Sequence, residues 1–465
     1  MTNAAPASSR RPAMTIFIAA LMLFSMFFGA GNLIFPPTLG VSSGTNFWPS
    51  ILGFLAAGVI LPVLAIIAIA ISGYNVRDLA SRGGFIFGLL FSIMAYLAIG
   101  AFYALPRTGA VAMETAITPL TGWEGTAANG IFNLAFFLIA LGLAWKPNSV
   151  IDTLGRFLTP ALVGLLVLLI TLALINYERT PGVPKDKYQT NPFVTGLFEG
   201  YNTMDAIAGL AFGIVIISAL RTKGFGDGKH LVRGTIITGA IAGVLLAAIY
   251  LGLGYISQTI PDGQSYESGA ALLADSADLT MGAVGQASFA AIVILACLTT
   301  AVGLISATSE FFNYLVPKIS YHLWAIIFTA LSIFMAFQGL DAVLAVAVPF
   351  ITFLYPPAIT LIFITLVQPL VKGSIVFYWA YRVALWTSVV WSAVSVLSAQ
   401  GIGFDSLAPI LHLSPGQELE LGWVVPSLIA LVIGTVADAI TKTGDTEQVS
   451  RADLAPHRGK NGIKT

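Results

Sequence analysis

The residues best suited to chemistry in this sequence are polar groups that interrupt two long apolar segments. Gly29, Gly31 and Asn32 stand midway along the apolar run 14–40. A similar patch in the run 193–220 contains Asp205, a carboxylate far from either end of that run. Glycine weakens a helix by about 1 kcal/mol relative to alanine, so the glycines favour local unwinding of both segments.

Unwound backbone in an apolar segment is suited to binding a ligand rather than to covalent catalysis. The half-helix that begins after a break carries a partial positive charge, which suits a carboxylate. Free carbonyl oxygens suit an ammonium group or a hard cation such as sodium. Two such breaks can therefore hold both ends of a zwitterionic amino acid. Interrupted helices at matching positions of two halves are typical of transporters built from inverted repeats.

Each of these patterns also has a plainer explanation. The glycines equally suit close packing of helices through small residues. Asp205 is either a structural partner of a buried group or a residue for cation coupling or for the substrate ammonium, since a charge at mid-membrane costs at least ~2.5 kcal/mol. Thr299 and Thr300 can supply oxygens to sodium or bond to carbonyls of their own helix. Arg107 is expected to extend towards the membrane surface rather than to pair with an acid.

Composition argues against several other classes of site. The single cysteine, Cys297, excludes an internal disulfide, and the four histidines are too far apart in sequence to suggest a metal centre. No spacing of metal ligands and no pairing of a nucleophile with a base indicates an enzyme. The 22 basic and 22 acidic residues balance, so nothing indicates binding to nucleic acid. We expect no cofactor apart from a coupling ion.

The elements that must position these residues are helices that span a membrane. Of the 465 residues, 57% are hydrophobic and 9% are charged, whereas soluble domains carry roughly 25% charged residues. A span needs about 20 mainly apolar residues, and runs that are apolar on all sides predict helices rather than strands. We predict an all-α polytopic membrane protein with twelve spans. They are residues 14–40, 47–71, 85–113, 127–145, 152–176, 193–220, 232–257, 280–312, 321–338, 342–367, 374–398 and 422–440.

The twelve predicted spans divide into two halves of five and an added pair. The halves are residues 14–176 and 193–367, and each begins with an interrupted segment. Because five is odd, the second half enters from the opposite side, which predicts a 5+5 inverted repeat. Residues 374–440 are two added helices. The two tails are residues 1–13 and 441–465, and the polar stretches 1–13 and 443–465 are expected to be disordered.

The distribution of basic residues predicts that both chain ends face the cytoplasm. With the N-terminus inside, four basic residues between 221 and 233 lie in an inner loop, and the long loop after the seventh span contains acids without a base. One outer loop, between the fifth and sixth spans, does not fit this orientation, because it contains basic residues. Arg10 and Arg11 raise the alternative of a signal peptide, but the apolar run is too long and has no clear cleavage site.

Residues 24–37 (FSMFFGAGNLIFPP) closely resemble the first-helix signature of the bacterial branched-chain amino acid:cation symporter family. Further similar stretches lie at 106–108, 152–160, 200–205 and 354–356, so the resemblance covers nearly the whole chain. It implies a leucine-transporter-like fold of the amino acid-polyamine-organocation superfamily. It also implies multi-pass insertion in the bacterial inner membrane and sodium-coupled uptake of leucine, isoleucine and valine by alternating access.

The resemblance further implies roles for individual residues. Backbone N–H groups at Ala30 and Gly31 would hold the substrate carboxylate, and Tyr103 would cap the substrate. The sixth-helix motif of the wider fold is absent here, so the role of Asp205 is not carried over. The predicted substrate-binding residues are Phe27, Phe28, Gly29, Ala30, Gly31, Asn32, Tyr103, Tyr201, Thr203, Met204 and Asp205. The predicted sodium ligands are Ser25, Phe28, Ala296, Thr299 and Thr300, with Phe27 and Asn32 at a second site.

Several alternatives stay open at this point. A symporter of the same fold could carry another amino acid, an amine or a nucleobase, and protons could replace sodium. A channel or a membrane enzyme would have a different mechanism altogether. The sequence does not indicate the preference among the three branched-chain amino acids or the oligomeric state. Substrate, sodium and membrane lipid are the expected partners.

Overall fold

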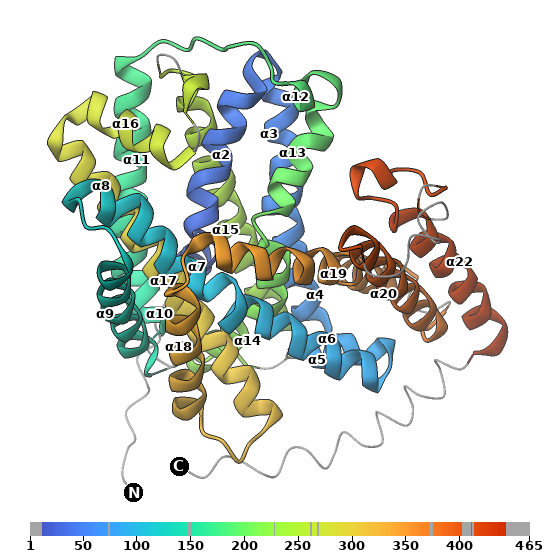
Figure 1. Cartoon of the computed structure of the whole chain (residues 1–465). Helices are drawn as coiled ribbons and strands as arrows, with labels where there is room; N and C mark the ends of the chain where they lie inside the picture. The colour runs from blue at the N-terminus through green and yellow to red at the C-terminus, as the bar shows by residue number, and fades with distance from the viewer. Residues whose placement is uncertain are drawn as a thin grey trace, which may run out of the picture. The chain divides into compact units, whose positions relative to one another are not determined.

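The computed structural model describes residues 12–72, 75–146, 150–226, 228–260, 263–266, 269–371, 375–401, 411 and 413–442. Within these ranges every regular element is a helix, which confirms the predicted all-α class (Figure 1). Most of the two predicted tails, 1–13 and 441–465, lies outside the described residues. Where the tails are described, Pro12 begins the first helix and Thr441 ends the last.

Contacts divide the chain into two compact units. The first unit is Met1–Val76 with Met94–Val348, and the second is Arg77–Ile93 with Pro349–Thr465. Both interrupted segments lie in the first unit. The predicted division into two repeats, 14–176 and 193–367, concerns symmetry rather than compactness, and it stays a prediction.

The first unit contains the helices of the candidate site and the elements that support them. They are α1 (Pro12–Phe27), α2 (Ala30–Ser43), η1 (Gly44–Asn46), α3 (Phe47–Leu55), η2 (Ala56–Ile60), α4 (Leu61–Ser72), η4 (Ala98–Phe102), α7 (Ala104–Ala112), η5 (Met113–Ile117), α8 (Thr118–Thr121), α9 (Thr126–Ala144), α10 (Val150–Thr153), η7 (Leu154–Leu158), α11 (Thr159–Asn176), α12 (Asp186–Thr190), α13 (Pro192–Tyr201), α14 (Asp205–Thr222), α15 (Lys229–Ile256), η8 (Gly263–Ser265), α16 (Gly269–Met281), α17 (Ala283–Leu315) and α18 (Tyr321–Ala336).

The second unit is built around two long helices that pack on each other, α20 (Trp379–Ala399) and α22 (Val424–Thr441). A Cβ atom at Gly434 would lie 2.6 Å from the Cα atom of Ala380, so glycine permits this close packing. The short elements of the unit are α5 (Val76–Ala80), η3 (Ser81–Gly83), η9 (Gln368–Leu370) and η11 (Gln417–Leu419). Two longer helices, α6 (Phe85–Leu97) and α19 (Leu340–Val367), contribute residues to both units, as does α5 through Val76.

Ten helical stretches of the described part are long and apolar enough to span a membrane. One of them, Gly31–Ser72, joins the second half of the first predicted span to the second predicted span. Two further apolar helices are shorter, Pro12–Phe27 and Tyr321–Ala336. All twelve predicted runs thus coincide with helical structure, although twelve crossings, the inverted repeat and the cytoplasmic termini stay predictions.

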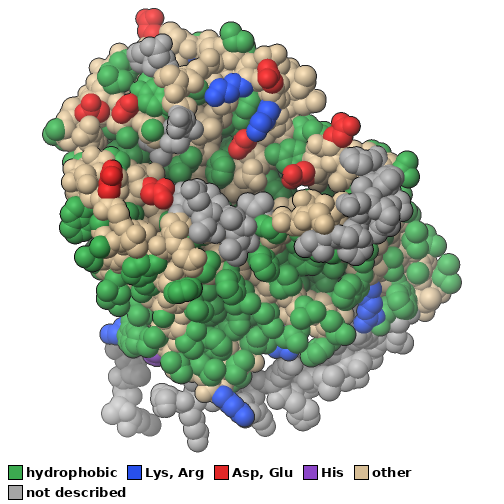
Figure 2. Space-filling model, viewed as in Figure 1, with side chains coloured by type: hydrophobic (Ala, Val, Ile, Leu, Met, Phe, Trp, Pro, Cys, Tyr) green, Lys and Arg blue, Asp and Glu red, His purple; other side chains and the backbone are tan. Residues whose placement is uncertain are grey.

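Helix α9 exposes an apolar face on the surface of the protein. Ile131, Leu134, Leu138 and Ile139 are each about half exposed or more and recur at helical spacing, whereas Asn133 is fully buried on the opposite face. Figure 2 shows hydrophobic side chains over broad areas of the visible face. Soluble monomers rarely expose apolar areas of this extent. The chain is therefore a multi-pass membrane protein.

Two helices are interrupted where the sequence predicts it. Helix α1 ends at Phe27 and α2 begins at Ala30, with extended backbone at Gly29 (φ −110°, ψ −162°). Helix α13 ends at Tyr201 and α14 begins at Asp205, after Met204 in the left-handed region (φ 66°, ψ 13°). That conformation is strained for a residue with a side chain, so the surrounding packing must hold it. Because α1 packs against α14, the two breaks are neighbours, as predicted.

A third interruption, not predicted, divides the span 85–113. The backbone leaves helical geometry at Gly100 (φ −84°, ψ −116°) and again at Tyr103 (φ −146°, ψ −72°), where η4 gives way to α7. A Cβ atom at Gly100 would lie 2.8 Å from Cγ2 of Thr308 on α17. Glycine therefore permits a close approach to α17 at the kink, and Ile99 and Ala104 on either side of it line a cavity.

Candidate functional site

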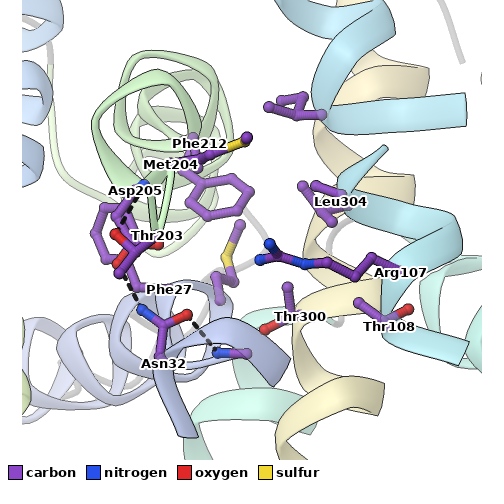
Figure 3. A pocket seen from close by; sticks show the side chains of 15 residues that line it. Phe27, Asn32, Arg107, Thr108, Thr203, Met204, Asp205, Phe212, Thr300 and Leu304 are labelled. Atoms are coloured by element: carbon purple, nitrogen blue, oxygen red, sulfur yellow. Dashed lines mark hydrogen bonds between the residues drawn. The ribbon is translucent and has the colours of Figure 1, made fainter. Parts of the chain in front are cut away.

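A narrow cavity lies in the first unit, where the two breaks face α7 and α17 (Figure 3). Its walls combine aromatic and aliphatic side chains with a few polar groups. The lining residues are Met26, Phe27, Gly29, Asn32, Ile99, Ala104, Arg107, Thr108, Thr203, Met204, Asp205, Ala208, Phe212, Thr300 and Leu304. Concave, mainly apolar pockets with a few convergent polar groups are typical of small-molecule sites.

Asn32 is the polar centre of this cavity. Its Nδ2 donates to Oδ2 of Asp205 at 2.5 Å and also to the hydroxyl of Tyr250. Its Oδ1 accepts a hydrogen bond of 3.3 Å from the backbone N–H of Gly29. Both Asn32 and Asp205 are almost completely buried. A single amide side chain therefore ties the break between α1 and α2 to the break between α13 and α14 and to α15.

Asp205 is the first residue of α14, where a carboxylate is stabilised by the partial positive charge of the helix N-terminus. Besides Asn32, the hydroxyl of Tyr250 donates to Oδ2 at 3.3 Å. The neighbouring Thr203 donates to the carbonyl of Gly200 at 2.8 Å, which keeps the break compact. Asp205 thus has the structural partners that the plainer explanation requires, and its side chain also lines the cavity.

A second polar cluster joins α1 to α17. The hydroxyls of Thr299 and Thr300 lie 3.1 and 3.2 Å from the carbonyl oxygen of Ser25. Thr299 also lies 3.1 Å from the carbonyl oxygen of Ala296. Thr299 therefore bonds to its own helix and also reaches across to α1. A Cβ atom at Gly29 would lie 2.9 Å from Oγ1 of Thr300, so glycine is needed where the break meets α17.

The cluster of Ser25, Ala296, Thr299 and Thr300 contains oxygen atoms and no formal charge. Hard monovalent cations are bound through such oxygens, which makes the cluster suited to sodium. Among the described residues no group of three or more His, Cys, Asp or Glu side chains could hold a metal ion. Any cation bound here would therefore rely on hydroxyl and carbonyl dipoles.

Some predicted substrate residues do not line the cavity. The ring of Phe28 stacks on Phe24 and Tyr250, with centroid distances of 5.3 and 6.1 Å. Tyr201 packs against Phe198 on α13, and Tyr103 contacts Arg107 rather than the cavity itself. Ala30 and Gly31 belong to the first turn of α2 and are not among the residues that line the cavity.

The main residue that the sequence analysis missed is Arg107. It was expected to extend towards the membrane surface, but it is only partly exposed and points into the cavity (Figure 3). A charged residue in the interior of an apolar run was the available signal. Phe212 also lines the cavity, with its ring edge-on to Phe27 at 5.4 Å. No local pattern marks Phe212, because its role depends on which helix α14 packs against.

Comparison with solved structures identifies the fold. The nucleobase-cation-symport-1 family transporter Mhp1, in a closed conformation with bromovinylhydantoin bound, matches with a TM-score of 0.58 and 16% identity, covering 91% of each chain. MhsT in complex with L-phenylalanine matches with a TM-score of 0.51 and 17% identity, covering 94% of this chain and all of that one. These likenesses show the leucine-transporter-like fold that the resemblance implied.

Sequence relatives share much more identity. The branched-chain amino acid permease BrnQ of Corynebacterium glutamicum is 52% identical over 424 residues, which are 91% of this chain and 95% of that protein. The permease BrnQ of Bacillus subtilis is 38% identical over 441 residues, 94% of this chain and all of that protein. A family model described as branched-chain amino acid transport protein matches residues 12–441. These names are those of transporters, not enzymes, and the chain belongs to the branched-chain amino acid transport protein family.

Proposed function

We propose that this transporter takes up leucine, isoleucine and valine together with sodium, by alternating access across the bacterial inner membrane. The names of the relatives support the substrate class. The observation that carries the proposal is that Asn32 and Asp205, from two separate helix breaks, meet at one cavity with apolar walls. The family's fold is one in which substrate binds at such breaks near the midplane.

The substrate would be held by complementary ends of the cavity. Backbone N–H groups in the first turn of α2, at Ala30 and Gly31, have no partner within their own helix and suit the carboxylate. The carboxylate of Asp205 suits the ammonium group. The aliphatic side chain would pack against Phe27 and Phe212, which gains about 0.8 kcal/mol for each CH₂ group removed from water.

Sodium would bind beside the substrate, between α1 and α17. The hydroxyls of Thr299 and Thr300 would turn their hydrogens away, and their oxygens would join the carbonyls of Ser25, Phe28 and Ala296. A second sodium site would use the carbonyl of Phe27 and a lone pair of the Asn32 side-chain oxygen. Because Gly29 lies against Thr300, a bound ion would order the break at which the substrate docks.

Coupling needs an energetic difference between conformations. Sodium must bind more tightly to the state that accepts the amino acid from outside, since a ligand of equal affinity for two states shifts nothing. In the proposed cycle, sodium stabilises the outward-open state and the amino acid then occupies the breaks. The helices that carry the breaks move against the remaining helices and release both to the cytoplasm.

The test is uptake of labelled leucine into proteoliposomes that contain the purified protein. We expect uptake to follow an inward sodium gradient and to be competed by unlabelled isoleucine and valine. Replacement of sodium by potassium, with and without a pH gradient, separates sodium coupling from proton coupling. Counterflow of leucine distinguishes a carrier from a channel. Absence of leucine uptake under every gradient, with uptake of an amine or nucleobase instead, would replace this proposal by the same-fold alternative.

A further inference from the structure

Arg107 has a fixed position on the wall of the cavity opposite Asp205. It is the fourth residue of α7, and its side chain reaches across towards the two breaks (Figure 3). Nη1 donates to the hydroxyl of Tyr103, and Cζ lies 4.6 Å from the centroid of the Tyr103 ring. One hydrogen bond and one cation–π contact therefore orient the guanidinium, which has five N–H donors in all.

The guanidinium also lies against the first turn of α2. A Cβ atom at Gly31 would be 2.8 Å from Nη2 of Arg107 and 3.4 Å from Cζ. Gly31 therefore leaves room for the arginine beside the backbone N–H groups that begin α2. The side-chain cation and the partial positive charge of the helix N-terminus reinforce each other at this end of the cavity.

No carboxylate among the described residues pairs with Arg107. The basic residues Arg156 and Lys223, by contrast, both pair with Asp152, at 2.9 Å and 2.5 Å. Asp205 is instead hydrogen-bonded to Asn32 and Tyr250 on the far wall. A charged side chain inside an apolar segment is costly in a membrane unless it has a partner, and Arg107 is only partly exposed. The cavity thus has a positive end and a negative end that do not neutralise each other by direct contact.

We propose that Arg107 binds the carboxylate of the substrate directly, and that Tyr103 is the positioning residue that holds the guanidinium in place. This inference rests on the proposed function and names a second ligand for the same substrate. Arginine binds a carboxylate through two parallel N–H···O hydrogen bonds, which a helix N-terminus alone does not offer. The site then selects a free α-amino acid, because an amide or ester of leucine lacks the anion that Arg107 requires.

The test compares leucine with leucinamide, which has the same ammonium group and side chain but no carboxylate. Apparent affinities come from the rise in melting temperature of the purified protein as each compound is titrated. The wild-type protein should favour leucine strongly. Arg107→Gln should weaken leucine binding by about 30-fold, as for loss of a charge-assisted hydrogen bond, and leave leucinamide nearly unchanged. Arg107→Lys and Tyr103→Phe should give intermediate ratios.

Arg156→Gln is the matched control, because Arg156 does not line the cavity and its ion pair is with Asp152. It should keep the wild-type ratio of leucine to leucinamide affinity. The role of Arg107 would be overturned if both Arg107 variants kept the wild-type ratio of leucine to leucinamide affinity. It would also be overturned if they lost affinity for the two compounds equally. If the wild-type protein is not stabilised by leucine at all, the proposed function fails, and that result is distinguishable from failure of Arg107 alone.

Discussion

Asn32 donates a hydrogen bond of 2.5 Å to Asp205, and this bond connects two helix breaks that are 173 residues apart in the sequence. The same amide accepts from the N–H of Gly29 and donates to the hydroxyl of Tyr250. One side chain therefore links the positions of the two breaks. The carboxylate that we assign to the substrate ammonium is thus held by hydrogen bonds from Asn32 and Tyr250.

Substitution of Asp205 by asparagine tests that assignment. The change keeps the size of the side chain and an acceptor for Asn32 and Tyr250 but removes the negative charge. We expect leucine affinity to fall by about 10- to 100-fold, which corresponds to a lost hydrogen bond to a charged group, and coupled uptake to be abolished. Uptake in proteoliposomes is the measurement, with Glu199→Gln as control because Glu199 does not line the cavity. Near-normal transport by Asp205→Asn would make Asp205 a structural residue.

Joint replacement of Thr299 and Thr300 by alanine tests the proposed sodium site. Loss of both hydroxyls removes two of the predicted sodium ligands, and each contact is worth about 1 kcal/mol. The sodium concentration for half-maximal uptake should therefore rise roughly tenfold or more. Uptake is measured against sodium concentration at constant ionic strength. Thr235→Ala is the control, because Thr235 is a buried threonine on α15 that bonds to the carbonyl of Leu231 on its own helix and does not line the cavity. Unchanged sodium dependence would remove the assignment.

Valine at Gly31 tests whether the substrate carboxylate docks at the start of α2. Its side chain would collide with Arg107, since even a Cβ atom would lie 2.8 Å from Nη2. We expect loss of the leucine-induced rise in melting temperature at concentrations that saturate the wild-type protein. Gly164→Val on α11 is the control, because a Cβ atom there meets nothing within 4 Å. Full leucine affinity in a folded Gly31→Val protein contradicts docking at this turn.

Alanine at Asp438 tests the stability of the second unit. The buried carboxylate of Asp438 on α22 accepts hydrogen bonds from the backbone N–H groups of Tyr378, Trp379 and Ala380 at the start of α20, at 2.7 to 3.0 Å. Asp438→Ala leaves three donors without an acceptor, which should lower the free energy of unfolding by roughly 2–4 kcal/mol. The melting temperature of the purified protein is the measurement. Asp438→Asn keeps one acceptor oxygen and should lower the melting temperature less. A wild-type melting temperature for Asp438→Ala would contradict a stabilising role for these three hydrogen bonds.

The sequence predicts the helices well because a bilayer imposes a simple condition on them. Residues such as 232–257 are apolar for the length of a membrane crossing, and α15 occupies Lys229–Ile256. Gly29 and Asn32 also mark a break locally, since both disfavour a helix interior. Gly100 gives no such unambiguous signal, because a lone glycine in an apolar helix equally suits close packing. Only the structure shows that Gly100 leaves helical geometry where it packs against Thr308, which is distant in the sequence.

The sequence by itself thus determined an all-helical membrane protein, its family, and two interrupted helices with a carboxylate in the second. These properties depend on hydrophobicity and on backbone preference, which are written in consecutive residues. Only the tertiary structure decided that Asn32 bonds to Asp205, that Arg107 turns into the cavity and that Thr300 reaches Ser25. Such contacts depend on how helices pack, because the direction of a side chain has a meaning only once its neighbours are in place.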